Sequence, residues 1–111
     1  MVIVSYSDAF KRQVRRLSRK YRRIRSDVQP LIDQLEAGEI PGDQIQGVGR
    51  TVYKVRIKNS DALRGKSGGY RIIYYLHTEG SVLLITIYSK TDQSDIDAAE
   101  LVNIIRQEDN S

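Results

Sequence analysis

Polar and apolar side chains alternate between residues 52 and 58, which predicts a β-strand with two different faces. The run reads Val-Tyr-Lys-Val-Arg-Ile-Lys, and its period of two places Lys54, Arg56 and Lys58 together on one side. Neighbouring cations repel one another, so a strand face that concentrates three of them favours an anionic ligand, such as a phosphodiester backbone. The alternative interpretation is a solvated face, on which the cations only keep the strand soluble.

The pattern ahead of this strand predicts a short strand followed by two helices. Residues 2–6 form a β-type run, and the Ser-Asp pair that follows suits the start of a helix. Over residues 8–23, apolar side chains recur every three or four positions, as on an amphipathic helix. We expect a second helix, capped by Ser26 with Gln29 and ending near Gly38, so that the two helices form an αα-hairpin.

The second half of the chain predicts three strands and a final helix. Residues 39–50 are rich in glycine and read as a loop, and the basic strand follows them. Residues 70–77 and 82–90 are rich in β-branched and aromatic side chains and should pair as an antiparallel hairpin. Ser94 can cap a last helix over residues 95–106.

The composition agrees with one domain spanning residues 1–111. A chain of 111 residues is long enough to bury one core. We therefore expect a small single α+β domain with an N-terminal strand, an αα-hairpin, an antiparallel sheet and a C-terminal helix. The formal net charge is +4, and nine of the 18 cationic residues lie between residues 11 and 25. With no cysteine and no apolar run long enough for a signal peptide or a membrane span, a cytoplasmic protein is expected.

Few residues could form an acid–base or metal site. His77 is the sole histidine and cysteine is absent, which disfavours a paired-imidazole mechanism and a multi-histidine or thiolate metal site. The carboxylates are scattered over predicted helix starts and loops, and Pro41-Gly42-Asp43 reads as a turn. We therefore expect a site of Lys, Arg and Tyr side chains, with no metal and no cofactor.

Strand alternation places further cations and a tyrosine near the basic strand. One face of the third predicted strand carries Arg71, and one face of the fourth carries Leu84, Thr86, Tyr88 and Lys90. If these faces adjoin the basic strand, four or five cations and one or two phenols surround a single patch. Such a patch can hold phosphates and stack a base. At least four of the seven tyrosines are expected to fill the core instead.

Three motifs follow one another along the predicted strands. They are Tyr-Lys-Val-Arg-Ile over residues 53–57, Gly-Tyr-Arg-Ile-Ile-Tyr-Tyr over residues 69–75 and Ile-Tyr-Ser-Lys over residues 87–90. Together with the order of elements, these motifs resemble the RelE/ParE superfamily of bacterial type II toxins. Residues 64–69, Arg-Gly-Lys-Ser-Gly-Gly, look most like the HigB-type branch. The resemblance implies a small α+β fold, ribosome-dependent cleavage of mRNA, and inactivation by a cognate antitoxin.

The resemblance implies site residues only where this sequence matches the family pattern. Lys54 and Arg56 match two cations on the strand after the hairpin, and Arg71 matches an arginine of the Gly-Tyr-Arg strand. RelE-like enzymes also use an arginine just after the last strand and a tyrosine in the C-terminal segment, where this chain has Thr91 and Asp97. The catalytic candidates are therefore Lys54, Arg56 and Arg71 and, near the unmatched positions, Lys90 and Tyr88.

Metal-free RNA cleavage is the chemistry that these residues suggest. The 2′-hydroxyl of RNA can attack the adjacent phosphate if one group removes its proton and others stabilise the charge. Crowding among arginines disfavours the charged form of a lysine, so a neutral Lys54 could be the base while Arg56 and Arg71 hold the phosphate. Lys90 would protonate the leaving oxygen. The remaining cations are expected to bind RNA or the ribosome: Lys58, Lys66, Arg12, Arg15, Arg16, Arg19, Arg22 and Arg23.

Two other functions stay open on the sequence alone. One is a ParE-like protein that poisons DNA gyrase by binding it and cleaves no RNA. The other is a catalytically degenerate module that binds RNA or sequesters an antitoxin, which Thr91 and Asp97 favour. The three matched cations favour the nuclease, because a gyrase binder has no stated need for a phosphate-directed set.

Overall fold

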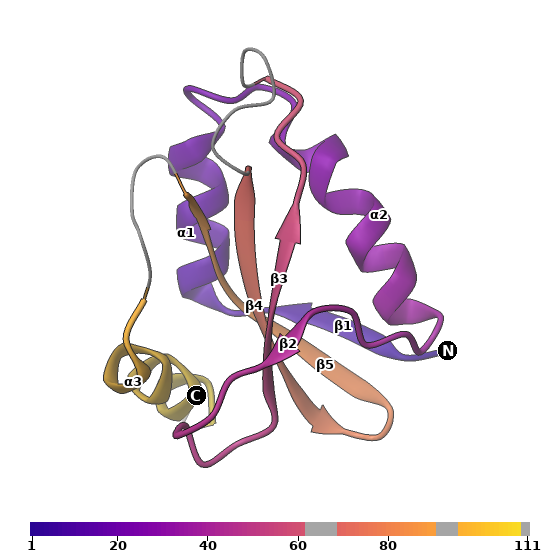
Figure 1. Cartoon of the computed structure of the whole chain (residues 1–111), viewed down its shortest axis with the longest axis vertical. Coiled ribbons are helices and arrows are strands. Elements are labelled where there is room, and N and C mark those ends of the chain that lie inside the picture. The colour runs from indigo at the N-terminus through magenta and orange to yellow at the C-terminus, as the bar shows by residue number, and fades with distance from the viewer. Residues whose placement is uncertain (62–68, 91–95, 110–111) are drawn as a thin grey trace.

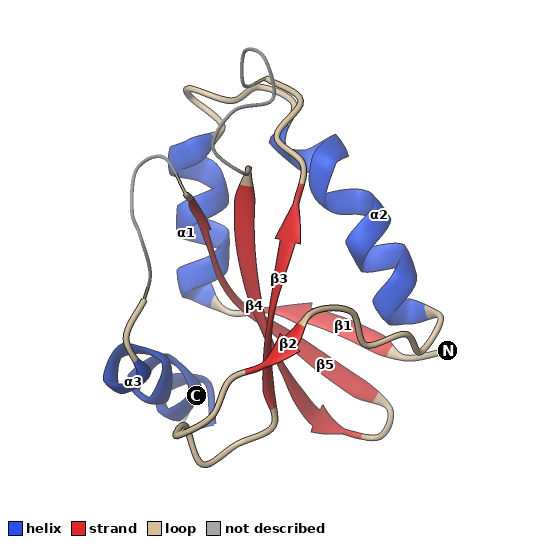
Figure 2. Cartoon of the chain, in the orientation of Figure 1, coloured by secondary structure: helices blue, strands red, loops and turns tan. Residues whose placement is uncertain are grey.

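The fold has three layers, with a five-stranded sheet between a helical hairpin and a third helix (Figure 1). The computed structural model describes residues 1–61, 69–90 and 96–109. Within them, α1 and α2 cover one face of the sheet and α3 covers part of the other (Figure 2). The predicted α+β fold is confirmed. In chain order the elements are β1 (Ile3–Tyr6), α1 (Asp8–Leu17), α2 (Ile24–Glu36), β2 (Asp43–Gln44), β3 (Val52–Ile57), β4 (Tyr70–Thr78), β5 (Ser81–Ser89) and α3 (Ala98–Asp109).

The sheet runs in the order β1-β5-β4-β3-β2. β4 and β5 form the predicted antiparallel hairpin, and Thr78 pairs with Ser81 at its turn. β3 pairs antiparallel with β4, as the sequence suggested. β1 lies parallel to β5, with Ile3 opposite Ser81, and forms one edge of the sheet, while β2 forms the other.

The first helix is shorter than predicted, because α1 ends at Leu17 and not at residue 23. A turn follows, in which the backbone N–H of Tyr21 donates to the carbonyl of Leu17 at 2.8 Å. Tyr21 and Ile24 continue the apolar spacing beyond that turn, and both are buried in the same cluster as α1. Apolar periodicity could not reveal this break. The same side chains would enter the same core whether the helix continued or ended in a turn.

The second helix begins at Ile24, two residues before its predicted cap. Ser26 lies inside α2, where its Oγ donates to a backbone carbonyl three residues earlier at 2.9 Å, so the predicted capping box is not formed. Pro30 consequently lies in the second turn and lacks the N–H that would bond to the carbonyl of Ser26. The predicted end is confirmed, since α2 stops at Glu36 and Gly38 takes a φ of 90°.

A β-bulge in β5 changes which of its side chains share a face. Ile73 pairs with Thr86, but the next β4 residue, Tyr74, pairs with Leu84, which leaves Ile85 as an extra residue. The predicted face that joined Leu84 to Thr86 is therefore wrong. Leu84 packs in the cluster under the helical hairpin, while Thr86 stays on the opposite face with Ile73.

Ser7 connects this bulge with the start of α1. Its buried Oγ donates to the carbonyl of Ile85 and accepts the backbone N–H of Phe10 at 2.9 Å. Its own N–H donates to the carbonyl of Leu84 at 3.0 Å. The buried hydroxyl of Ser7 thus has a partner both as hydrogen-bond donor and as acceptor. These bonds fix the start of α1 against β5.

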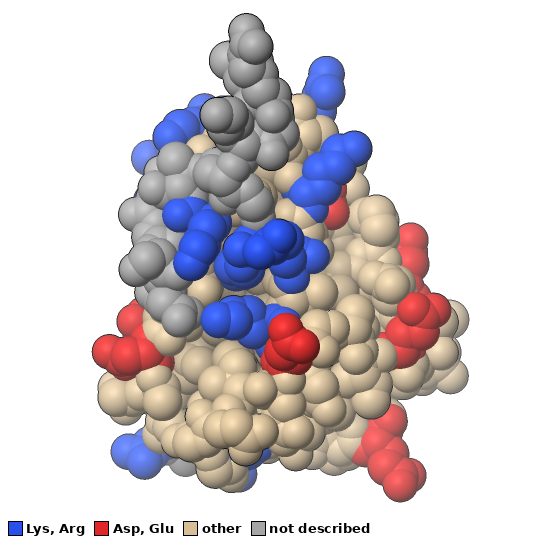
Figure 3. Space-filling model, in the orientation of Figure 1, with Lys and Arg blue, Asp and Glu red and all other residues tan. Residues whose placement is uncertain are grey.

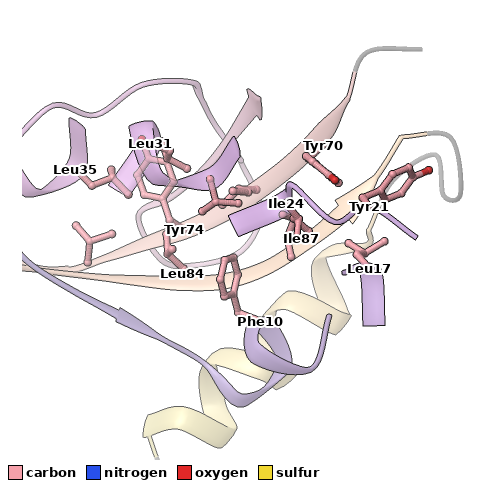
Figure 4. Close-up of a cluster of buried hydrophobic side chains, with 13 residues drawn as sticks. Phe10, Leu17, Tyr21, Ile24, Leu31, Leu35, Tyr70, Tyr74, Leu84 and Ile87 are labelled. Carbon is pink, nitrogen blue, oxygen red and sulfur yellow. The ribbon is translucent and has the colours of Figure 1, made fainter. Parts of the chain in front are cut away.

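Two apolar clusters lie on the two faces of the sheet. Figure 4 shows the first, in which Phe10 and Leu31 of the hairpin meet Tyr74 and Leu84 of the sheet. The second lies under α3 and includes Leu101 with several residues of β4 and β5. The expectation that most tyrosines fill the core is confirmed, because five of the seven are buried: Tyr21, Tyr70, Tyr74, Tyr75 and Tyr88.

The last helix begins later than the predicted range of 95–106. Asp97, predicted to lie within it, instead caps α3, and its Oδ1 accepts the backbone N–H of Glu100 at 2.8 Å. Ser94, the predicted cap, lies outside the described residues. A carboxylate therefore occupies the positive end of α3, where it favours the helix.

Two acidic residues attach the other end of α3 to the rest of the fold. Glu108 accepts the backbone N–H of Asp8, at the start of α1, at 3.2 Å. Asp109 pairs with the guanidinium of Arg50 at 3.3 Å. Because both contacts are exposed, they position the helix more than they stabilise it.

Tyr70 and Tyr74 lie on one face of β4 and differ in their hydrogen bonds. The hydroxyl of Tyr74 donates to the carbonyl of Pro41, whereas the Tyr70 hydroxyl finds no partner in the described part of the chain. Burial raises the pKa of both phenols, and for Tyr70 the nearby Asp27 carboxylate raises it further. The two positions therefore separate a satisfied buried hydroxyl from an unsatisfied one.

We expect Tyr74→Phe to lower the free energy of unfolding by about 1 kcal/mol, because the carbonyl of Pro41 loses its donor. Tyr70→Phe should leave that free energy unchanged or raise it, since it removes a buried polar group without a partner. Chemical denaturation of both variants beside the unmodified protein measures the difference. Equal losses in the two variants would show that the Tyr70 hydroxyl is bonded in solution.

Candidate functional site

The basic residues of β3 and β4 share one face of the sheet, as the sequence predicted. Arg56 lies directly opposite Arg71, and Lys54 follows on the same face, opposite Ile73. We call Lys54, Arg56 and Arg71 the basic triad. Figure 3 shows Lys and Arg side chains gathered over the middle of the molecule on the side toward the viewer.

The triad combines exposed and partly buried cations. Arg56 is exposed, whereas Lys54 and Arg71 are partly buried, and Nη1 of Arg71 reaches the carbonyl of Tyr70 at 3.4 Å. Like charges directly opposite one another in a ladder destabilise it. An anion bound between Arg56 and Arg71 would replace this repulsion by attraction.

Two further cations border the triad at the ends of strands. Lys58 directly follows β3, and Lys90 directly follows β5; both are exposed. The backbone N–H of Lys90 donates to the carbonyl of Gly69 at 3.0 Å, which ties the end of β5 to the start of β4. Gly69 takes a φ of 64°, and a Cβ there would clash with a carbonyl of β3. Lys66 and Thr91 lie outside the described residues.

Tyr88, a catalytic candidate in the sequence, lies on the same face of the sheet as the triad but is buried. It lies opposite Arg71 in the ladder, yet only 2 % of its side chain is exposed, and it belongs to the cluster formed with Leu101 and Ile105 of α3. A ring held in that way cannot stack on a base without leaving the core. The alternation of β5 predicted the face of Tyr88 correctly but could not show that α3 covers it.

A carboxylate lies beside the triad where the sequence predicted only a turn. Asp43 and Gln44 form the edge strand β2, and Asp43 lies directly opposite Lys54. Residues that face each other across antiparallel strands share a side of the sheet, so Asp43 lies on the triad side. Figure 3 shows an acidic side chain at the border of the basic cluster. Two residues are too few to show a strand period, so no pattern in the sequence indicated β2.

The cations of α1 and of the turn after it form a second basic surface, behind the sheet as seen from the triad. Four exposed arginines line one shallow hollow, together with Gln13, whose side chain accepts a hydrogen bond from Arg16 Nε at 2.8 Å. Arg19, Arg22 and Arg23, predicted on the same helix, lie in the turn after it. The four arginines are Arg12, Arg15, Arg16 and Arg19.

A hollow of about 380 Å³ lies between α1 and α2. Its lining is apolar at Phe10, Val14 and Val28 and basic at Lys11 and Arg25. Phe10 and Val28 belong to the core cluster on the hairpin side of the sheet, so the hollow lies away from the triad. It takes no part in the chemistry of that face.

The described ranges contain no candidate metal site and no candidate membrane-spanning helix. No three His, Asp or Glu side chains gather there in a way that could hold a metal ion. No helix in the same ranges has the length and apolarity to cross a membrane. What the triad does offer is a set of guanidinium and ammonium donors, which bind phosphate oxygens well.

The fold and this face define a small α+β protein with a cationic sheet surface and a basic helical hairpin behind it. A sequence profile described as "RelE toxin of RelE / RelB toxin-antitoxin system" matches residues 9–107. The chain therefore belongs to the RelE toxin family, which confirms the resemblance that its strand motifs indicated.

The fold also matches a solved structure, that of a mutant of the E. coli toxin RelE in the free state. The match has a TM-score of 0.55 and covers 96 % of each chain at 20 % sequence identity. At this identity the likeness supports the architecture of the chain.

The opposed arginines should reduce stability in the free protein. We expect Arg56→Gln to raise the free energy of unfolding by about 0.2–1 kcal/mol at low salt, because it removes a like charge opposite Arg71. The gain should shrink as added salt screens the repulsion. Denaturation at two salt concentrations measures it, and Lys58→Gln, beyond the paired part of β3, is the control. A loss of stability in Arg56→Gln would mean that Arg56 makes a favourable contact instead.

Proposed function

We propose that this chain is a type II toxin that cleaves mRNA on the translating ribosome by metal-independent attack of the RNA 2′-hydroxyl. The observation that carries the proposal is the pairing of Arg56 with Arg71 across β3 and β4, with Lys54 on the same face. Three cations fixed on a rigid sheet suit a phosphate that gains negative charge during the reaction. Membership of the RelE toxin family supports the same conclusion.

The roles of the triad follow from the chemistry of the reaction. The 2′-oxygen attacks phosphorus, a charged phosphorane forms, and the 5′-oxygen leaves with a proton. Arg56 and Arg71 present planar pairs of N–H donors that match two phosphate oxygens. Lys54 adds a third positive charge, and Lys90, at the end of β5, supplies the proton for the leaving oxygen.

The ribosome must supply what this sheet lacks. Asp97, which stands where RelE-like enzymes have a functional tyrosine, caps α3 and cannot stack on a base. Tyr88 is buried, so neither Asp97 nor Tyr88 holds the substrate base. Orientation of mRNA by the ribosome therefore replaces binding by the protein, and the isolated protein should cleave RNA poorly.

The proposed partners are the ribosome with its mRNA and a cognate antitoxin, and the proposed compartment is the cytoplasm, where translation occurs. The HigB-type branch rests on residues 64–69, most of which lie outside the described ranges. A ParE-like gyrase inhibitor is the alternative, and it would leave the triad without a role. A degenerate RNA-binding module is a second alternative, which the capping role of Asp97 favours.

Translation in a purified reconstituted system separates these functions. The protein is added during translation of a defined mRNA, and the 5′ ends of the mRNA are mapped with and without ribosomes. Cuts that require translation support the nuclease. Inhibition of gyrase supercoiling with intact mRNA would establish the ParE-like alternative, and binding without either effect would establish the degenerate module.

Arg71 provides the sharpest test of the triad. Arg71→Ala should lower the rate of mRNA cleavage on ribosomes by about 10²–10³, because a donor to the developing charge is lost. Arg71→Lys should be nearly as damaging, since it keeps the charge and loses the paired donors. Single-turnover cleavage at saturating protein measures both rates, and circular dichroism checks the fold. Full activity in Arg71→Ala would make Arg71 a structural cation and end the catalytic interpretation of this sheet.

The arginines of α1 and of the turn after it should bind the ribosome without taking part in cleavage. Replacing Arg12, Arg15, Arg16 and Arg19 by Gln should weaken co-sedimentation with ribosomes and reduce its salt dependence, because fewer counterions are released from rRNA. The double variant Lys11→Gln with Arg25→Gln, at the hollow between the helices, is the matched control. Undiminished binding by the fourfold variant would show that these arginines are only a solvated surface.

A further inference from the structure

Asp43 is the single acidic residue within the strands of the described sheet. The pairing of β2 with β3 places it opposite Lys54 and therefore on the face that carries the basic triad. Its side chain is exposed at the edge of the sheet. Adjacent strands lie about 4.8 Å apart, so the backbone of Asp43 lies one strand spacing from that of Lys54.

Several contacts fix Asp43 in this register, although β2 has only two residues. The N–H of Ile45 donates to a carbonyl of β3 at 2.8 Å, and the carbonyl of Pro41 accepts the hydroxyl of Tyr74. Gly42 takes a φ of 98°, and a Cβ there would clash with the backbone carbonyl of Lys54. Glycine therefore allows the close approach of the two strands immediately before Asp43. The backbone that carries Asp43 is therefore held from both sides, which limits where its carboxylate can lie.

We propose that Asp43 is a catalytic residue of this face and that its carboxylate takes the proton from the attacking 2′-hydroxyl; this inference rests on the proposed ribonuclease function. An ionised carboxylate is a proton acceptor from the outset, whereas a lysine ammonium must first lose a proton. With Asp43 as the base, Lys54 acts as a cation throughout and attracts the phosphate, which replaces the role of neutral base that the sequence suggested for it.

The proton transfers balance across the sheet. As the proton passes to Asp43, the 2′-oxygen forms its bond to phosphorus; the bond from phosphorus to the 5′-oxygen then breaks, and that oxygen takes a proton from the ammonium of Lys90. The products are a 2′,3′-cyclic phosphate and a 5′-hydroxyl, and both side chains regain their protonation states from water. β2 and β5 flank the strands that carry the triad, so acceptor and donor approach from opposite sides, as an in-line displacement requires.

Asp43→Asn tests the proposal, because it keeps the shape of the side chain and removes the carboxylate that would take the proton. We expect the single-turnover rate of mRNA cleavage on programmed ribosomes, at saturating protein, to fall by about 10²–10⁴. The concentration that half-saturates cleavage should stay the same or decrease, since a negative charge near RNA is lost. Asp43→Glu should recover most of the rate, because an exposed edge accommodates one more methylene.

Two variants serve as matched controls. Gln44→Ala alters the same strand at the residue opposite Tyr53, on the other side of the sheet, and Asp33→Asn removes one carboxylate from α2. Both should cleave at the unmodified rate. Equal losses in Gln44→Ala and Asp43→Asn would show that β2 matters only for structure, and an inactive Asp43→Glu would show that the carboxylate is not the acting group.

The unmodified protein, tested beside Asp43→Asn, distinguishes an error in the role of Asp43 from an error in the ribonuclease function. If it cleaves mRNA and Asp43→Asn cleaves equally fast, the role of Asp43 is wrong and the ribonuclease function stands. If the unmodified protein produces no cleavage under translation, the ribonuclease function is wrong, and the role of Asp43 falls with it.

Discussion

The register between β3 and β4 is the constraint on which the rest of the structure depends. It runs through six residue pairs, from Val52 with Tyr75 to Ile57 with Tyr70. A slip by one residue would turn every side chain of β3 to the opposite face and move Arg56 into the core under the helical hairpin. The repulsion between Arg56 and Arg71 is worth about 0.2–1 kcal/mol. Burial of even one large apolar side chain contributes about 1.5–3 kcal/mol, which exceeds this repulsion. Packing of the core therefore decides the register, even though that register places Arg56 opposite Arg71.

Most of the fold could be predicted from the sequence, because strand alternation and helical spacing are local signals. The strands over residues 52–57 and 70–78 and the end of the second helix near Gly38 follow directly from such patterns. The failures occur where a non-local contact decides. The turn after Leu17 is hidden by an apolar stripe that continues through it, and the bulge at Ile85 is hydrogen-bonded to Ser7, which lies far from it in the sequence. A local period cannot record either event.

In the candidate site, too, local sequence patterns were sufficient for some residues, while non-local contacts decided the position of others. Lys54 and Arg56 could be assigned to one face because β3 alternates clearly, and the strand period of two placed Arg71 on one face of β4. Tyr88 lies on that face too, but its burial depends on where α3 lies, which no period within β5 can show. The position of Asp43 beside the triad could not be predicted, because a two-residue strand has no sequence pattern of its own and forms only by pairing with β3. The face on which a residue of a long strand lies can thus be predicted from the sequence, whereas a short edge strand or burial under a helix cannot.

The parallel pairing of β1 with β5 gives the chain an order of assembly. Residues 3–6 are synthesised first, yet they pair with residues 81–84, so the first strand has no neighbour until most of the sheet exists. Ser7 adds to this delay, because the start of α1 is anchored to the same part of β5. During synthesis the basic face is therefore held on an incomplete sheet. The sheet therefore gains its β1 edge only after residues 81–84 have been made, long after the residues of β1 themselves.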